Sequence, residues 1–146
     1  MSNFLVISVI GLAGGLAIGL QAPLASLIGQ RSGVMESVFI IHAGGALGAL
    51  LFIILNKGGT LGQWQTIPWY ALCAGLLGII LISSQVLIIP KIGVAAAITL
   101  IIAGQLIMAT CVDHFGILGI EARTLNWERL AGMGIVLLGV WLTIRS

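Results

Sequence analysis

The sequence predicts an all-α integral membrane protein with five transmembrane helices, and three observations lead to this class. Hydrophobic residues make up 60% of the 146 residues and charged residues only 7%, whereas a soluble domain carries about a quarter charged residues. Five long apolar runs fill nearly all of the chain, and the first four reach the ~20 residues that cross a bilayer as a helix. Apolar residues do not alternate along these runs, which excludes barrel strands and leaves helices.

The whole chain, residues 1–146, is interpreted as a single transmembrane domain. A net charge of +2 is too small to indicate a nucleic acid as partner. The N-terminus lacks the basic segment of a signal peptide, so the first run is kept as a spanning helix. The five helices are predicted at residues 4–29, 35–55, 67–89, 93–112 and 129–145.

The first helix carries a stripe of glycines on one face, since residues four apart share a face. The second helix repeats this pattern. A face without side chains lets another helix approach closely, so we expect helix packing there. A cavity lining is the alternative, because absent side chains leave room for a ligand. The positions are Gly11, Gly15, Gly19, Gly44 and Gly48.

Pro23 lies late in the first helix. Proline cannot donate to the carbonyl group of Gly19 and clashes with it, so a kink is predicted. Gln21 lies beside the freed carbonyl group. A kinked, polar patch at membrane depth is a candidate ligand surface, and a kink satisfied by a neighbouring helix is the alternative.

Two ionisable residues belong to the second helix, where a charged side chain at the helix centre costs at least ~2.5 kcal/mol. His42 is the only titratable side chain well inside a predicted helix, and Glu36 lies at the start of the same helix. An imidazole can exchange protons near neutral pH, so His42 is a candidate for both substrate binding and proton coupling. Glu36 is the second coupling candidate. The alternatives are a neutral His42 bonded across a helix interface and a Glu36 in interfacial water.

The third helix follows a polar, glycine-rich connection at residues 56–66, which predicts a flexible loop. Trp64 and Trp69 flank the end of this loop, where interfacial aromatic residues belong. Ser83, Ser84 and Gln85 form a polar cluster late in the third helix. Pro90 is expected to end that helix and to make the next turn short.

The fourth helix contains Gln105 near its middle. Its amide offers two donors and an acceptor, suited either to a polar or cationic ligand or to a bond between helices. Asp113 and His114 end the helix at the membrane edge and are predicted to be gating or structural polar groups. Asp113 could cap a helix or pair with Arg123 or Arg129. Cys73 and Cys111 lie inside separate apolar runs and are expected to pack in the core. A disulfide or metal site would need clustered ligands, and the sequence has none.

The cations fall evenly on the two sides of the membrane, three on each. Orientation is normally set by an excess of Lys and Arg on the cytoplasmic side. Without this excess, the chain is predicted to insert both ways and to pair with an inverted copy of itself. The pair would follow the inverted-repeat plan of many transporters. One side holds Lys57, Arg123 and Arg129, and the other holds Arg31, Lys91 and Arg145.

A series of motifs extends from the third helix to the end of the fourth: Trp69-Tyr70, Pro90-Lys91-Ile92-Gly93, Gly104-Gln105 and Asp113-His114-Phe115-Gly116. In order and spacing it resembles the YdcZ-type family of the drug/metabolite transporter (DMT) superfamily. The resemblance implies a ten-helix assembly, formed by a fused chain, two homologues or a dual-topology homodimer, with a peripheral last helix that helps to dimerise. The small multidrug transporters of that superfamily carry a glutamate in their first helix. This chain has none there, so their proton antiport is not carried over.

We therefore predict a secondary transporter of the cell membrane, an exporter of small organic metabolites or amphipathic cations that works by alternating access. Gln21, His42, Trp69 and Gln105 are predicted to bind the substrate. The expected partners are a second, antiparallel copy, membrane lipid and the substrate, with no cofactor and no metal. No catalytic constellation occurs in the sequence, so an enzyme is not expected. The alternatives are a non-transporting scaffold or accessory subunit, a passive channel, and half of an obligate heterodimer.

Overall fold

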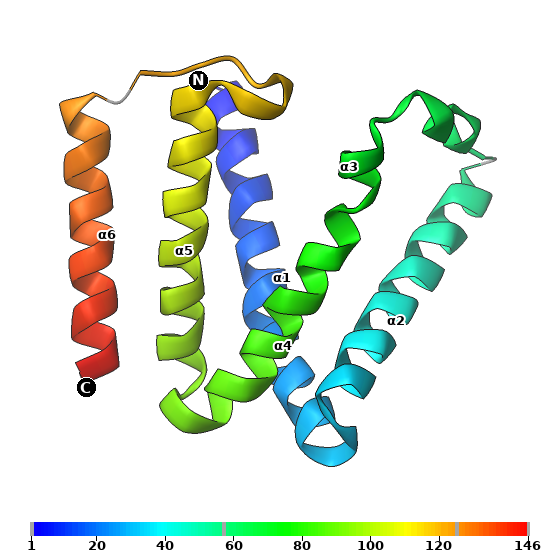
Figure 1. Ribbon diagram of the computed structural model, residues 1–146, viewed down its shortest axis with the longest axis horizontal. Helices are drawn as coiled ribbons and strands as arrows, with labels where there is room; N and C mark the ends of the chain where they lie inside the picture. Colours follow the sequence, from blue (N-terminus) through cyan, green and yellow to red (C-terminus); the bar gives the residue numbers. More distant parts are fainter. Residues whose placement is uncertain (1, 57, 125, 146) are drawn as a thin grey trace. The chain divides into compact units, whose positions relative to one another are not determined.

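The computed structural model describes residues 2–56, 58–124 and 126–145, and helices are the only regular elements in these ranges (Figure 1). Five helical segments among them are long and apolar enough to cross a membrane, which confirms the prediction of five such helices. Lys57, one of the cations in the predicted charge balance, lies outside the described residues. The segments are Phe4–Ser32, Val34–Leu55, Trp69–Ile92, Val94–Phe115 and Trp127–Arg145.

The chain divides into two compact units, Met1–Pro90 and Lys91–Ser146. Whether residues 1–146 act as a single transmembrane domain stays a prediction. The first unit contains α1 (Ser2–Ser32), α2 (Val34–Leu55), the 3-10 helix η1 (Leu61–Thr66), α3 (Trp69–Leu72) and most of α4 (Ala74–Ile92). The second unit contains α5 (Val94–Phe115), the short 3-10 helix η2 (Ile117–Gly119) and α6 (Trp127–Arg145).

A tight turn at Gly33 joins α1 to α2 in the first unit (Figure 1). Gly33 has a φ of 115°, which glycine adopts readily and other residues avoid. The Glu36 carboxylate lies over Gly33, where it would meet any added Cβ atom. Glu36 stands in the first turn of α2, and a negative charge there interacts favourably with the helix dipole.

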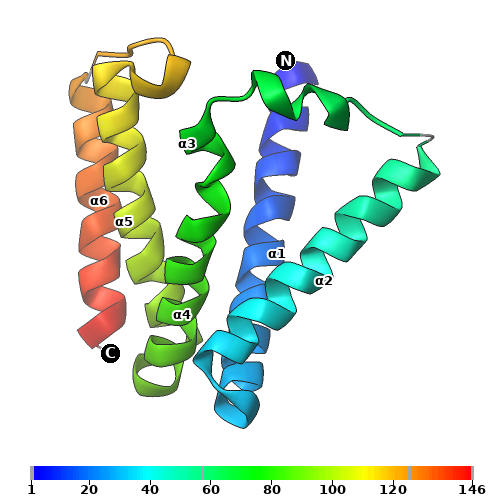
Figure 2. The same cartoon turned by 45° about the vertical axis from the view of Figure 1, so that its right-hand side comes forward.

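The apolar core of the first unit lies where α1, α2 and α4 converge near this turn. Ala25, Val38, Ile82 and Val86 form the buried cluster. The Ser37 hydroxyl group donates to the Ala25 carbonyl group at 2.8 Å and so joins α1 to α2. Figure 2 shows α2 diverging from α1 with distance from the turn.

Two prolines lie inside helices of this unit. Pro90 belongs to α4, which continues to Ile92, so the prediction that Pro90 ends the helix is wrong. Pro90 removes one backbone donor, and transmembrane helices tolerate this loss because neighbouring groups satisfy the freed carbonyl. α1 likewise continues through Pro23 to Ser32. The predicted loop at residues 56–66 contains η1, so part of it is helical.

In the second unit, α5 and α6 lie side by side and antiparallel in both views (Figures 1 and 2). α5 ends at Phe115, and the next residue, Gly116, caps it with the left-handed backbone that glycine commonly adopts there. Asn126 caps α6, because its side-chain oxygen accepts from the Arg129 amide at 2.9 Å. This cap explains why the helix begins at Trp127, two residues before the predicted start at residue 129.

Candidate functional site

His42 lies half-buried on α2, inside the first unit. Its Nδ1 atom is 2.8 Å from the Val38 carbonyl oxygen, one helical turn earlier. A carbonyl group only accepts, so Nδ1 carries the proton and donates it. In a neutral imidazole with this tautomer, Nε2 is the acceptor atom.

Gly78 of α4 faces the His42 ring. A Cβ atom built on Gly78 would lie 2.5 Å from Nε2 and 3.2 Å from Cε1. The imidazole thus occupies the space that the missing side chain leaves, and Nε2 is held against α4. His42 therefore lies at an interface between α2 and α4. The alternative to a functional role, a histidine that packs across a helix interface, requires this position. Its roles in substrate binding and proton coupling stay predictions.

The other predicted substrate-binding residues lie on exposed helix faces. Gln21 of α1 and Gln105 of α5 are exposed, and Trp69 is 77% exposed and packs edge-on against Tyr70. Within the described part of the first unit, no hydrogen bond links Gln21, His42 and Trp69. Their shared contact with a substrate stays a prediction.

Gln85 is a buried polar residue to which the sequence analysis gave no role. It is 2% exposed, and its Oε1 atom has no hydrogen-bond partner in the described part of the chain. An unpaired amide oxygen is costly in an apolar environment, so this position is functionally notable. Its spacing from Gly78, Ile82 and Ile89 puts these residues on one face of α4 and is the pattern that could have identified it.

The glycine stripes are open in this chain. A Cβ atom on any of the five predicted packing glycines would meet no atom within 4 Å. Close contacts occur instead at Gly29, which faces Val86, and at Gly78. Packing of the stripes stays a prediction, and any helix that packs on them would have to come from another molecule or from a different arrangement of this chain. The open positions are Gly11, Gly15, Gly19, Gly44 and Gly48.

Asp113 pairs with Arg129, one of the two partners that the sequence left open. Arg129 Nη1 lies 3.3 Å from Asp113 Oδ2, and each side chain is a little over one-third exposed. The Asp113 carbonyl group also accepts from the Arg123 amide at 2.7 Å. His114 is exposed and packs edge-on against Phe115. This cluster ties the α5–α6 connection together, while gating stays a prediction.

The cysteines depart from the prediction of core packing, which is wrong for both. Cys73 and Cys111 are free and exposed. An apolar run in a membrane protein faces lipid as readily as the core, so apolar neighbours in the sequence did not indicate burial. Among the described residues, no group of three or more His, Cys, Asp or Glu side chains could hold a metal ion.

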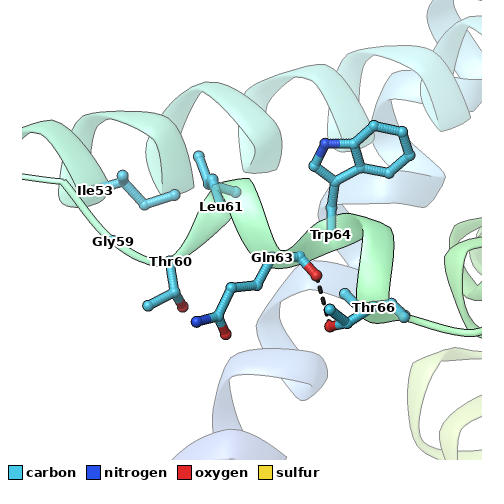
Figure 3. Close-up of a pocket in the computed structure, with 8 residues that line it drawn as sticks. Ile53, Gly59, Thr60, Leu61, Gln63, Trp64 and Thr66 are labelled. Carbon is cyan, nitrogen blue, oxygen red and sulfur yellow. Dashed lines mark hydrogen bonds between the residues drawn. The ribbon is translucent and has the colours of Figure 1, made fainter.

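Cavities that lie within single units include one beside η1 and one between α5 and α6. One, of about 420 Å³, lies between Ile53 of α2 and the η1 segment with Trp64 (Figure 3). There the Thr66 hydroxyl group donates to the Gln63 carbonyl group at 2.8 Å. The other, of about 450 Å³, lies between α5 and α6 beside the Asp113–Arg129 pair. Neither cavity is lined by the four predicted substrate-binding residues.

Comparison with known proteins points to one family. The family described as "Putative inner membrane exporter, YdcZ" matches residues 6–142. The "Inner membrane protein YdcZ" of Escherichia coli (strain K12) is 27% identical over 139 residues, which cover 92% of this chain and 91% of the relative. No solved structure matches the chain. The family match begins in the first span and ends in the last, so it includes every candidate residue described above.

Proposed function

This chain is a multi-pass inner membrane protein of the YdcZ family, and from this membership we propose that it exports small organic metabolites or amphipathic cations as an antiparallel homodimer. The observation that carries the proposal is the family match over residues 6–142 together with the five apolar spans. A membrane transport role follows from them. The substrate class, the dimer and alternating access are the proposed part.

The charge pattern supports the antiparallel dimer. An odd number of spans puts the two ends of the chain on opposite sides, and the cations are balanced three against three. Two oppositely inserted copies would form an inverted repeat, in which substrate sites lie near the bilayer midplane at the repeat interface. The open glycine faces of α1 and α2 are surfaces that a second copy can approach closely.

Within this dimer, we assign the substrate cavity to Gln21, His42, Trp69 and Gln105 of both copies. Gln21, Trp69 and Gln105 are exposed in the single chain, so a substrate or a second copy can reach them. His42 is the proposed proton carrier, because its Nε2 atom is an acceptor held against α4. A proton on Nε2 would put a charged donor at the α2–α4 contact. It would therefore favour a state in which these helices separate and water or substrate reaches the ring.

The test is export of ethidium, a fluorescent amphipathic cation, from vesicles that contain only the purified protein. We expect saturable efflux driven by a pH gradient. Linear, unsaturable flux would identify a passive channel. No flux of ethidium or of neutral and anionic dyes, with the dimer intact, would favour the scaffold. Flux only after addition of a homologue would indicate an obligate heterodimer.

A further inference from the structure

The cavity between α5 and α6 combines an apolar groove with a pair of opposite charges at one end. Its volume of about 450 Å³ falls in the range of ~300–1,000 Å³ that small-molecule sites occupy. Ala109 and Gly132 keep the groove open, and Met133 forms part of its wall. Gly132 has no atom within 4 Å of its Cβ position, so its missing side chain leaves empty space.

The charges lie at the end of the groove where α5 ends and α6 begins. Asp113 stands in the last turn of α5 and Arg129 in the first turn of α6. From Arg129 to Val136, the deepest lining residue of α6, the groove follows the helix for about 10 Å at ~1.5 Å per residue. The groove therefore has a charged end and an apolar length. A phospholipid has the same arrangement, with a charged headgroup and an apolar acyl chain.

The ion pair leaves polar atoms available on both partners. Arg129 Nη1 contacts Asp113 Oδ2 at 3.3 Å, and within the described residues the guanidinium group makes no second ion pair. Arg129 can therefore donate to a phosphate group through its other nitrogens, and Asp113 can accept from an ammonium group through Oδ1. Both side chains are partly exposed and reachable.

The neighbouring charges select the headgroup. Residues 113–129 contain three acidic side chains, Asp113, Glu121 and Glu128, against two arginines, Arg123 and Arg129. This excess of negative charge disfavours a purely anionic headgroup. A headgroup with one phosphate and one primary ammonium group matches the Arg129–Asp113 pair in both signs.

We propose that the α5–α6 groove binds one phosphatidylethanolamine molecule, with an acyl chain in the groove, the phosphate at Arg129 and the ammonium group at Asp113. This inference goes beyond the proposed export and does not rest on it, since lipid binding can be measured without a transported substrate.

The experiment is native mass spectrometry of the purified full-length protein, titrated with phosphatidylethanolamine, phosphatidylglycerol or the acyl-free headgroup glycerophosphoethanolamine. Gly132→Leu fills the groove with a side chain. We expect it to weaken phosphatidylethanolamine binding by at least about tenfold, because the acyl chain can then bury fewer of its methylene groups in the groove. Gly134→Leu is the matched control, since Gly134 also has open space around its Cβ position but does not line the groove. Asp113→Asn should remove the preference for phosphatidylethanolamine over phosphatidylglycerol.

Three outcomes overturn the proposal. Equal phosphatidylethanolamine binding by Gly132→Leu and Gly134→Leu would show that lipid does not occupy the groove. Equal binding of the acyl-free headgroup would show a free-phosphate site without an acyl chain. Loss of the dimer in Gly132→Leu alone, with lipid binding unchanged, would show that a second copy of the chain fills the groove.

Discussion

At the scale of single residues, His42 and Gly78 form a matched pair. The histidine ring is anchored by its bond to the Val38 carbonyl group, and its other nitrogen lies where a Gly78 side chain would be. Gly78 therefore acts as a positioning residue, because any larger residue displaces the ring. The proposed proton carrier depends on this arrangement, and each partner can be tested separately.

Gly78→Ala should destabilise the protein by about 1–3 kcal/mol, because the new methyl group forces the imidazole away from its bond with Val38. Unfolding in a mixed detergent–denaturant series measures the change. Gly75→Ala is the control on the same helix, since a Cβ atom there meets nothing within 4 Å. The double variant His42→Ala/Gly78→Ala should recover most of the loss. If it loses as much as the sum of the single variants, the two residues are not coupled.

His42→Ala should abolish the pH dependence of transport while the dimer stays intact. The reason is that, within the described residues, His42 is the only His or carboxyl side chain of the five spans that lies outside their first and last turns. Transport of ethidium at several pH values, with crosslinking as a measure of the dimer, provides the test. A pH profile that persists in His42→Ala would make the histidine structural and leave Glu36 as the coupling candidate.

At the scale of the helices, close packing in the first unit is concentrated at the end near Gly33. Ala25, Gly29 and Ser37 are small residues that let α1, α2 and α4 meet there. Towards their other ends, α1 and α2 have open glycine stripes and diverge (Figure 2). The same helix pair thus has a packed end and an open end, and glycine substitutions should separate the two.

Gly29→Ala should cost about 1–3 kcal/mol, because its methyl group overlaps the Val86 side chain and overpacks the core. Gly19→Ala should not destabilise the single chain, since nothing lies near its Cβ position and alanine has the higher helix propensity. Gly19→Leu should nevertheless weaken the proposed dimer, if the stripe packs on a second copy. Unfolding and crosslinking of the three variants measure the two effects, and a Gly19→Leu dimer of normal strength would remove the stripe from the interface.

Hydropathy predicted all five spans, because length and apolar content decide whether a segment crosses a bilayer. It did not predict which face of each helix is buried. A helix that is apolar all round shows no amphipathic pattern, so hydropathy alone did not distinguish the buried Gln85 from the exposed Gln105, or the exposed Cys111 from a core cysteine. Those properties depend on how helices pack, and the contacts of Gly29 and Gly78 became visible only in the structure.

At the scale of the whole molecule, the two orientations of the chain should be nearly equal in energy. The cations that set orientation are balanced, so each added positive charge should shift the distribution. The proposed antiparallel dimer requires both orientations in one membrane. A strong preference for one of them would leave the chain without an inverted partner of its own kind.

The orientation can be measured in intact cells with a single cysteine placed after Ser146 in a Cys73→Ala, Cys111→Ala background. Both natural cysteines are exposed, so they must be removed before a membrane-impermeant thiol reagent is used. We expect about half of the molecules to be labelled, because balanced cations leave the orientation undecided. Gln65→Arg adds a charge to the side of Lys57 and should raise the labelled fraction, since it draws that side into the cytoplasm and leaves the C-terminus outside. Ser32→Arg adds the same charge to the opposite side and should lower the fraction. Labelling of all or none of the molecules, unmoved by either arginine, would show one fixed orientation and would replace the antiparallel homodimer with a pairing between this chain and an oppositely oriented homologue.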